Sequence, residues 1–271
     1  MTAVDTVVLA VDPLLSGDLD PGIVGIVLLK VVVAFTLLLV SVMLMIWFER
    51  KLVADMHNRI GPAVAGPFGI LQTLADGIKL FFKEDLIPDR SDRVIFKLAP
   101  YLSLVPAFLV FAIVPIGGDF SSGDGAVTWF GERTYLQVAD PPVGVLFFLA
   151  LSSIAVYGVM LAGWSSGSKY PLLGSVRASA QMISYEAALG LAIATVFLTS
   201  GSLSTHDIVA SQVTGNWNVL TTGVVPFLVF LVAGTAELNR PPFDLVEAEQ
   251  ELVGGFHTEY SSIRFALFFL A

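Results

Sequence analysis

The residues best suited to chemistry in this sequence form a dense group of carboxylates near its C-terminal end. Like charges held so close repel one another, so some should be protonated near neutral pH or neutralised by partners. Apolar residues such as Val246 and Phe256 interrupt the group and indicate partial burial. We therefore predict a proton-binding cluster, with a solvated acidic loop as the alternative. Residues 237–260 hold six carboxylates against one cation, Arg240: Glu237, Asp244, Glu247, Glu249, Glu251 and Glu259.

A further carboxylate, Glu186, lies within an apolar segment, about one turn from the end expected to be cytoplasmic. A charge inside a membrane span costs about 2.5–3.5 kcal/mol even on lenient scales and usually faces a polar interior. Glu237 ends the next apolar segment at a similar depth. We predict that both belong to a proton path; a snorkelling or structurally paired glutamate is the alternative for Glu186.

Pro241 and Pro242 suit the first turn of a helix, where the missing N–H of proline is not needed. A helix that runs on from them would place Asp244, Glu247 and Glu251 on one face, at positions i, i+3 and i+7. Gly254 and Gly255 would then end it.

Composition places these residues in a membrane protein. Of the 271 residues 55% are hydrophobic and 14% are charged, whereas soluble domains carry about 25% charged residues. The absence of cysteine excludes disulfides, thiolate metal sites and cysteine-held iron–sulfur clusters in these residues. The three histidines lack metal-ligand spacing, so we expect no metal site. The net charge of −9 and the lack of a basic patch do not indicate nucleic-acid binding.

The elements that position the carboxylates are predicted to be membrane helices. We expect an all-α integral membrane protein, a multi-span helical bundle forming a single membrane domain over residues 1–271. A final apolar segment, 263–271, is too short to cross a bilayer that needs roughly 20 residues, so it is expected to be the truncated start of a sixth span. Five segments are long enough to be full spans: 24–48, 99–116, 143–164, 182–198 and 220–236.

The distribution of basic residues predicts the orientation. Eight of the fourteen Lys and Arg residues lie between the first and second spans. The positive-inside rule therefore places residues 1–22 outside as an exoplasmic tail and the 237–260 loop in the cytoplasm. Lys30 interrupts the first span and either reaches outward to an interface or pairs internally.

The first cytoplasmic connection contains an amphipathic helix over residues 68–83. Leu71, Leu74 and Ile78 recur at helical spacing beside a polar stripe, which suits a helix lying in the membrane interface. Asp76 and Lys79 are one turn apart and can pair. A surface helix with an ordinary weak ion pair is the alternative.

The sequence also resembles one known family, the H subunit of proton-pumping NADH:quinone oxidoreductase, respiratory complex I. The similarity runs in order from about residue 24 to the end, and its motifs are long. They are Glu49-Arg50-Lys51, Asn58-Arg59-Ile60-Gly61-Pro62, Leu71-Gln72 with Asp76 and Lys79, Ser168-Lys169-Tyr170 with Arg177, Ile183-Ser184-Tyr185-Glu186, Ala236-Glu237 with Asn239-Arg240 and Phe243-Asp244, and the acidic run from Glu247 to Tyr260.

The resemblance implies a membrane subunit that forms the membrane side of the quinone-binding chamber. It also implies the start of the acidic path that couples quinone reduction by NADH to proton translocation. The implied site residues of the quinone chamber and its entry are Arg50, Arg59, Asp76, Arg240, Phe243, Phe265 and Phe269. Those of the proton path are Glu186, Glu237, Asp244, Glu247, Glu249 and Glu251.

The resemblance also implies the surroundings of the chain. Ubiquinone or menaquinone would be the substrate, no group would be bound covalently, and FMN and iron–sulfur clusters would belong to partner subunits. Those partners are peripheral-arm quinone-site subunits docked on the cytoplasmic loops, and small and antiporter-like membrane subunits. The chain would act only within this enzyme, in a lipid membrane that the acidic tail suggests is a bacterial plasma membrane.

Two other functions remain open from the sequence. A homologous membrane subunit of a proton-pumping hydrogenase-type complex shares the ancestry, but Asp76 and the dense acidic loop favour the quinone enzyme. A stand-alone proton-coupled transporter would use Glu186 and Glu237, yet the sequence has no visible inverted repeat to support it.

Overall fold

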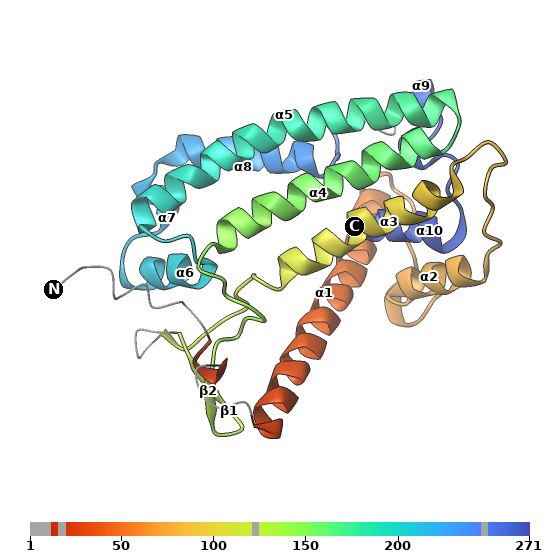
Figure 1. Ribbon diagram of the computed structural model, residues 1–271. Helices are drawn as coiled ribbons and strands as arrows, with labels where there is room; N and C mark the ends of the chain where they lie inside the picture. The colour runs from red at the N-terminus through yellow and green to blue at the C-terminus, as the bar shows by residue number, and fades with distance from the viewer. Residues whose placement is uncertain (1–11, 16–19, 121–124, 245–248) are drawn as a thin grey trace.

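Helices make up most of the chain in the computed structural model, which describes residues 12–15, 20–120, 125–244 and 249–271 (Figure 1). The predicted fold class, an all-α multi-span membrane protein, is confirmed. Four helices of the described part are long and apolar enough to cross a membrane: α1 (Pro21–Met56), α3 (Arg93–Phe111), α4 (Gly144–Ser165) and α5 (Lys169–Ser200).

The segment expected as a fifth span, 220–236, is divided between two helices. The four-residue helix α7 (Asn218–Thr221) comes first, and α8 (Val224–Glu237) follows. Gly223 separates them with a φ of 86°, a conformation that glycine adopts without strain. With 14 residues, α8 is about 21 Å long, shorter than the ~30 Å hydrocarbon core.

The core is a layer of neighbouring helices in which α4 packs between α3 and α5, and α5 packs between α4 and α8 (Figure 1). Small residues let these helices approach closely, as is common in membrane bundles. A Cβ atom on Gly158 would lie 2.2 Å from the Ser103 hydroxyl oxygen of α3, and one on Gly163 would lie 2.2 Å from that of Ser175 on α5. Both glycines of α4 are therefore required by the packing.

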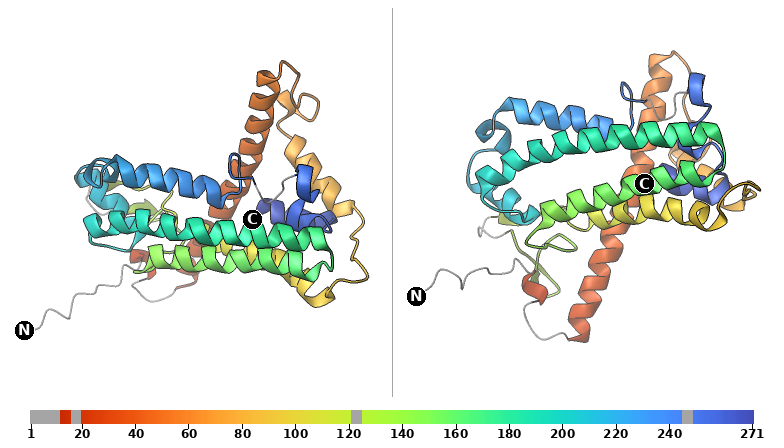
Figure 2. Two further views of the ribbon diagram at one scale, coloured as in Figure 1. Left: turned by 90° about the horizontal axis from the view of Figure 1, so that it is seen from above. Right: turned by 45° about the horizontal axis from the view of Figure 1, so that its top comes forward.

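Helix α1 crosses this layer steeply and extends beyond it, as both views of Figure 2 show. Its far end is joined by the 3-10 turn η2 (Pro67–Gly69) to α2 (Gln72–Phe82), within the predicted amphipathic segment. The exposed apolar side chains of α2 include Phe81 and Phe82, at 70% and 88% exposure. Such a surface suits an interfacial helix.

The C-terminal elements fold back onto the start of α3. A short helix α9 (Glu249–Leu252) and the 3-10 turn η4 (Gly255–His257) lead into α10 (Ser262–Leu270), which packs on α3 and α2. The Tyr260 ring stacks on Phe96 with 4.0 Å between centroids. This contact fixes α10 beside the first turns of α3.

A small β-hairpin lies at the opposite end of the molecule and was not predicted. Strands β1 (Val127–Trp129) and β2 (Glu132–Thr134) are antiparallel. Their two-residue turn, Phe130-Gly131, has φ values of 53° and 92°, and positive φ at both positions matches the right-handed twist of a hairpin. The 3-10 turn η1 (Pro13–Leu15) packs against β2, and α6 (Thr205–Thr214) follows α5 at the same end.

Lys30 pairs internally, which settles the question that the sequence left open. Its Nζ donates to the Asp12 carboxylate and, at 2.9 Å, to the Thr134 hydroxyl, which itself donates to Asp12 Oδ2 at 2.8 Å. The three residues are between 0% and 8% exposed. This network joins α1 to the residue before η1 and to the hairpin.

Replacing Lys30 with Met should lower the free energy of unfolding by about 3–5 kcal/mol, because Asp12 would stay buried without its cation. Thr134→Val should have a smaller effect of about 1 kcal/mol. Unfolding of the purified protein in detergent would measure both. Lys97→Met, at an exposed position of α3, is the matched control. Equal stability of the Lys30 and Lys97 variants would show that the pair does not hold α1.

Candidate functional site

Glu186 and Glu237, which we call the inner glutamates, come together inside the helix layer. Glu186 belongs to α5, Glu237 is the last residue of α8, and their carboxylates interact electrostatically. Each is half-buried and is bound by a serine of α4. Ser153 Oγ is hydrogen-bonded to Glu186 Oε1, and Ser152 Oγ donates to Glu237 Oε1 at 2.9 Å. Two carboxylates from neighbouring helices are therefore held by adjacent residues of a third.

Glu186 lies near the middle of its helix and not one turn from an end, because α5 begins at Lys169 and not at residue 182. The hydropathy pattern predicted too late a start for this helix, because its first turns carry the charged residues Lys169 and Arg177. Pro171 is tolerated there because the first turn needs no N–H donor from it. The short helix α8 ends at the level of Glu186, and this brings Glu237 to it.

Gln181 fixes the segment that follows Glu237. The residue is 9% exposed, and the two N–H groups of its Nε2 are shared among three acceptors, Ala236 O at 3.0 Å, Asn239 Oδ1 at 3.0 Å and Phe243 O at 2.8 Å. These bonds connect α5 with the end of α8 and with the loop beyond it. Neither the hydropathy nor the charge pattern pointed to Gln181.

The prediction of a helix that runs on from Pro241 and Pro242 is wrong for residues 241–244. They form a turn in which Phe243 N donates to Arg240 O at 2.8 Å. The bonds from Gln181 hold the segment in this shape, and the next helix of the described residues, α9, spans Glu249–Leu252. The Phe243 ring packs against Tyr185, with 5.2 Å between centroids, one residue from Glu186. Asp244 Oδ1 is buried without a hydrogen-bond partner among the described residues.

The remaining predicted acids are distributed differently. Glu251 is paired with Arg177 at 2.8 Å on the surface, where both side chains are well exposed. The backbone of Glu249 belongs to α9, but its side chain lies outside the described part of the structure, as does the whole of Glu247.

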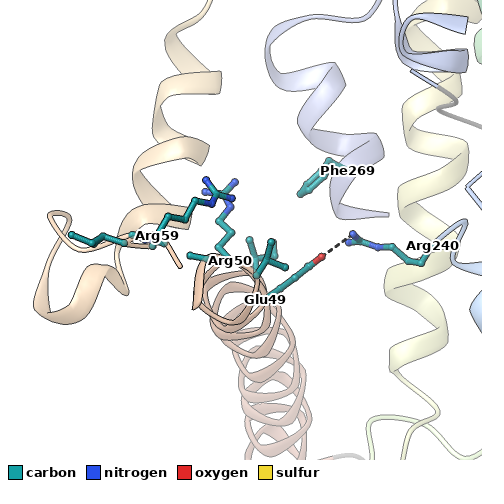
Figure 3. A pocket seen from close by; sticks show the side chains of 11 residues that line it. Glu49, Arg50, Arg59, Arg240 and Phe269 are labelled. Atoms are coloured by element: carbon teal, nitrogen blue, oxygen red, sulfur yellow. Dashed lines mark hydrogen bonds and ion pairs between the residues drawn. The ribbon is translucent and has the colours of Figure 1, made fainter. Parts of the chain in front are cut away.

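A pocket of about 500 Å³ opens at the far end of α1 (Figure 3). Figure 3 shows Glu49 and Arg240 pointing toward each other, with Phe269 of α10 close to their contact. Glu49 Oε1 accepts from Arg240 Nη1 at 3.2 Å. Four residues predicted for the quinone entry thus line one cavity, and Glu49 was not predicted as a site residue. The lining comprises Ile46, Glu49, Arg50, Val53, Ala54, Arg59, Ile60, Gly61, Pro62, Arg240 and Phe269.

Asp76 does not line this pocket itself, but it binds Arg50, which does. Arg50 Nη1 donates to Asp76 Oδ2 at 2.7 Å and Gln72 Nε2 donates to Asp76 Oδ1 at 3.2 Å, while Lys79 lies 3.6 Å away. Burial alone would raise the pKa of Asp76, but the hydrogen bonds and charges of these neighbours outweigh it and lower the pKa. Asp76 therefore stays ionised at neutral pH and fixes the Arg50 guanidinium.

Phe265 lies outside the pocket lining, in the aromatic cluster under α10. It contacts the His257 ring at 5.3 Å and the Phe269 ring at 6.4 Å between centroids. Burial lowers the pKa of His257, which favours its neutral form. Phe265 thus contacts Phe269, which lines the pocket, without lining the pocket itself.

Tyr260 satisfies a carbonyl that a proline leaves without a donor. The intrahelical donor to Phe96 O would be the N–H of residue 100, but Pro100 has none. Tyr260 Oη donates to this carbonyl at 3.1 Å. Burial raises the pKa of Tyr260 from 10.0 to about 12. The stability contributed by its neutral form is therefore present below pH 10 and is lost as the pH rises through about 12.

Tyr260→Phe should lower the free energy of unfolding by about 1–3 kcal/mol, because the buried Phe96 carbonyl would lose its donor. The same substitution should be less harmful in a Pro100→Ala background, where the introduced alanine supplies an intrahelical N–H. A double-mutant cycle on unfolding measures this coupling. Additive effects of the two substitutions would contradict the assignment.

Comparison with known proteins supplies the family. A family described as NADH dehydrogenase matches residues 29–271. The H subunit of NADH-quinone oxidoreductase from Frankia alni is 56% identical over 269 residues, which cover 98% of this chain and 57% of the relative. The proteins of the same name from Frankia casuarinae and Streptomyces avermitilis are 56% and 51% identical, over 90% of this chain and 52% and 53% of theirs.

The chain therefore spans between 52% and 57% of the length of these curated relatives. The resemblance drawn from the sequence motifs is confirmed by a match that covers the pocket, both inner glutamates and Tyr260. This chain belongs to the NADH dehydrogenase family and is similar, along nearly all of its residues, to the H subunit of NADH-quinone oxidoreductase.

Proposed function

We propose that this chain is the membrane subunit of NADH:quinone oxidoreductase that forms the membrane side of the quinone chamber and the start of the proton path. The observation that carries the proposal is the pocket at the end of α1, whose lining combines Arg50, Arg59 and Arg240 with apolar side chains. Arg240 follows Glu237 by three residues, so one short segment connects the pocket with the inner glutamates.

The lining suits a quinone in two ways. Ile46, Val53, Ile60 and Phe269 offer apolar surface for an isoprenoid tail, and the arginines offer donors for carbonyl oxygens that gain negative charge on reduction. Quinone reduction takes up two electrons and two protons. Charge that develops in a low-dielectric site changes the proton affinity of nearby carboxylates.

The proposed path leads from the pocket along the loop to the inner glutamates. Arg240 lines the pocket and is paired with Glu49, so negative charge on a bound quinone would compete with Glu49 for this arginine. The loop that carries Arg240 is bound to α5 through Gln181. Movement or protonation at this loop would then reach Glu237 and Glu186. Asp244, Glu247, Glu249 and Glu251 belong to this proposal as its outer acids.

In this proposal the electron chemistry is housed elsewhere. Iron–sulfur clusters would lie in partner subunits, because the 271 residues contain no cysteine to hold a cluster, and FMN would be bound by a partner subunit too. Peripheral-arm subunits would dock on the loops around the pocket, and small and antiporter-like subunits would continue the path in the membrane. The bilayer would be a bacterial plasma membrane, with the N-terminus outside and the 237–260 loop in the cytoplasm.

Replacing Glu237 with Gln in the assembled complex should lower NADH:quinone turnover about tenfold or more, because the amide cannot carry a proton between states. NADH–ferricyanide activity, which bypasses the quinone site, should stay unchanged and report intact assembly. Paired assays on membranes that contain the variant complex measure both activities.

Glu132→Gln is the matched control, since Glu132 is exposed on the hairpin at the opposite end of the molecule. Quinone turnover in the Glu237 variant equal to that of this control would count against the proton path. Co-purification of the chain with a nickel–iron subunit and no flavin subunit would favour the hydrogenase-type complex instead.

Replacing Arg240 with Gln should raise the KM for quinone by up to about fivefold and change kcat less. The Glu49–Arg240 pair is half exposed, and pairs of this kind contribute at most about 1 kcal/mol. Initial-rate measurements with a short-chain quinone would determine both constants. Arg93→Gln, at an exposed arginine at the start of α3, is the control; equal KM values in the two variants would remove Arg240 from the quinone site.

A further inference from the structure

The inner glutamates are each bound by a neutral hydroxyl group. Ser152 and Ser153, which supply these groups, are adjacent in the middle of α4, the helix that runs from Gly144 to Ser165. Successive residues of a helix point about 100° apart. One serine can therefore bind Glu237 of α8 while the next binds Glu186 of α5.

The Ser153 hydroxyl has two acceptors and one proton. Its Oγ lies within hydrogen-bond distance of Glu186 Oε1 and 3.1 Å from Leu149 O, one turn earlier in α4. When Glu186 is ionised, it can only accept, so Ser153 must donate to it to make this bond. When Glu186 is protonated, it can donate to Ser153, and the serine proton is then free to bond Leu149 O.

The Ser152 hydroxyl binds only one of the two carboxylate oxygens of Glu237. It donates to Glu237 Oε1 at 2.9 Å, and Glu237 Oε2 is buried with no hydrogen-bond partner in the described part of the chain. A hydroxyl of this kind aims the carboxylate without adding a charge. Within a membrane, where polar groups need protein partners, such a bond determines the side-chain direction.

We propose that Ser152 and Ser153 are positioning residues of the proton path: Ser152 aims Glu237, and the Ser153 hydroxyl turns between Glu186 and the Leu149 carbonyl as Glu186 loses or gains a proton. Ser153 keeps its own proton throughout, because the Leu149 carbonyl accepts a hydrogen bond from the hydroxyl but does not take up its proton. The proposal rests on the proposed function of the two glutamates. It adds a protonation-dependent contact between α5 and α4.

The test uses the assembled complex with Ser153→Ala, Ser153→Thr and Ser152→Ala. Ser153→Ala removes the donor to the ionised carboxylate, so the acidic limb of the pH profile of quinone turnover should move to higher pH by about one unit. Ser153→Thr keeps the hydroxyl and should restore the wild-type profile. Ser152→Ala should lower turnover about fivefold. Ser41→Ala is the control, because the Ser41 hydroxyl donates to the backbone oxygen of Leu38, at 2.8 Å, at an exposed position of α1.

A role limited to helix packing predicts a different result. Ser153→Ala would then lower turnover by the same factor at every pH, or leave it unchanged, and either result overturns the proposal. A pH shift that persists in a Glu186→Gln background would also overturn it, since the shift must act through this carboxyl. If Ser153→Ala fails to assemble, Ser153→Cys keeps the size with a weaker donor and should give a smaller shift in the same direction.

An infrared difference spectrum on quinone reduction gives a readout that does not depend on turnover. The carboxyl band that disappears in Glu186→Gln should change frequency in Ser153→Ala and not in Ser41→Ala; an unchanged band overturns the proposal. Normal quinone turnover in both Glu186→Gln and Glu237→Gln would instead count against the proposed function. The infrared band would still decide whether Ser153 positions Glu186.

Discussion

The arrangement of the proposed site depends on the hydrogen bonds that the buried Gln181 amide donates. Its nitrogen reaches the last turn of α8 and both ends of the loop turn that follows it. Together with the contact between the Tyr185 and Phe243 rings, these bonds hold residues 239–243 against α5. Glu237, Arg240 and Phe243 all take their positions from this segment, so one neutral side chain helps to fix a carboxylate, a cation at the pocket and an aromatic ring.

Five described carboxylates in and around the site fall into two groups that differ in their partners. Glu49, Asp76 and Glu251, toward the surface, are each bound by an arginine. Glu186 and Glu237, inside the layer, are bound by serines. An arginine side chain can only donate to a carboxylate, which suits a fixed structural contact. A hydroxyl can donate or accept, so it can bond to a carboxyl group in either form. In the proposed path the inner acids change state and the outer pairs hold the loops.

Much of the fold could be predicted from the sequence, because the hydropathy and charge of a segment depend only on the residues within that segment. Four apolar segments correspond to long helices, and the acids at 186 and 237 interact, although Glu186 lies farther from the end of its helix than its segment suggested. The start of α5 and the break at Gly223 were missed, since window averages do not resolve polar first turns or a single glycine. Pro100 did carry a signal: a proline inside a helix leaves the carbonyl four residues earlier without a donor. The sequence could not say that Tyr260 supplies it, because that contact joins residues 164 positions apart.

The placement of polar contacts along α1 explains why a pocket can exist beside it. This helix buries few of its side chains against the rest of the protein. It is held at one end by Lys30 with Asp12 and Thr134, and at the other by Glu49 with Arg240 and Arg50 with Asp76. The two sets differ in strength, since a buried pair is costly to break whereas half-exposed pairs contribute at most about 1 kcal/mol each. The end of α1 at the pocket is thus held in part by the weaker pairs, and two of the arginines that line the cavity, Arg50 and Arg240, form them.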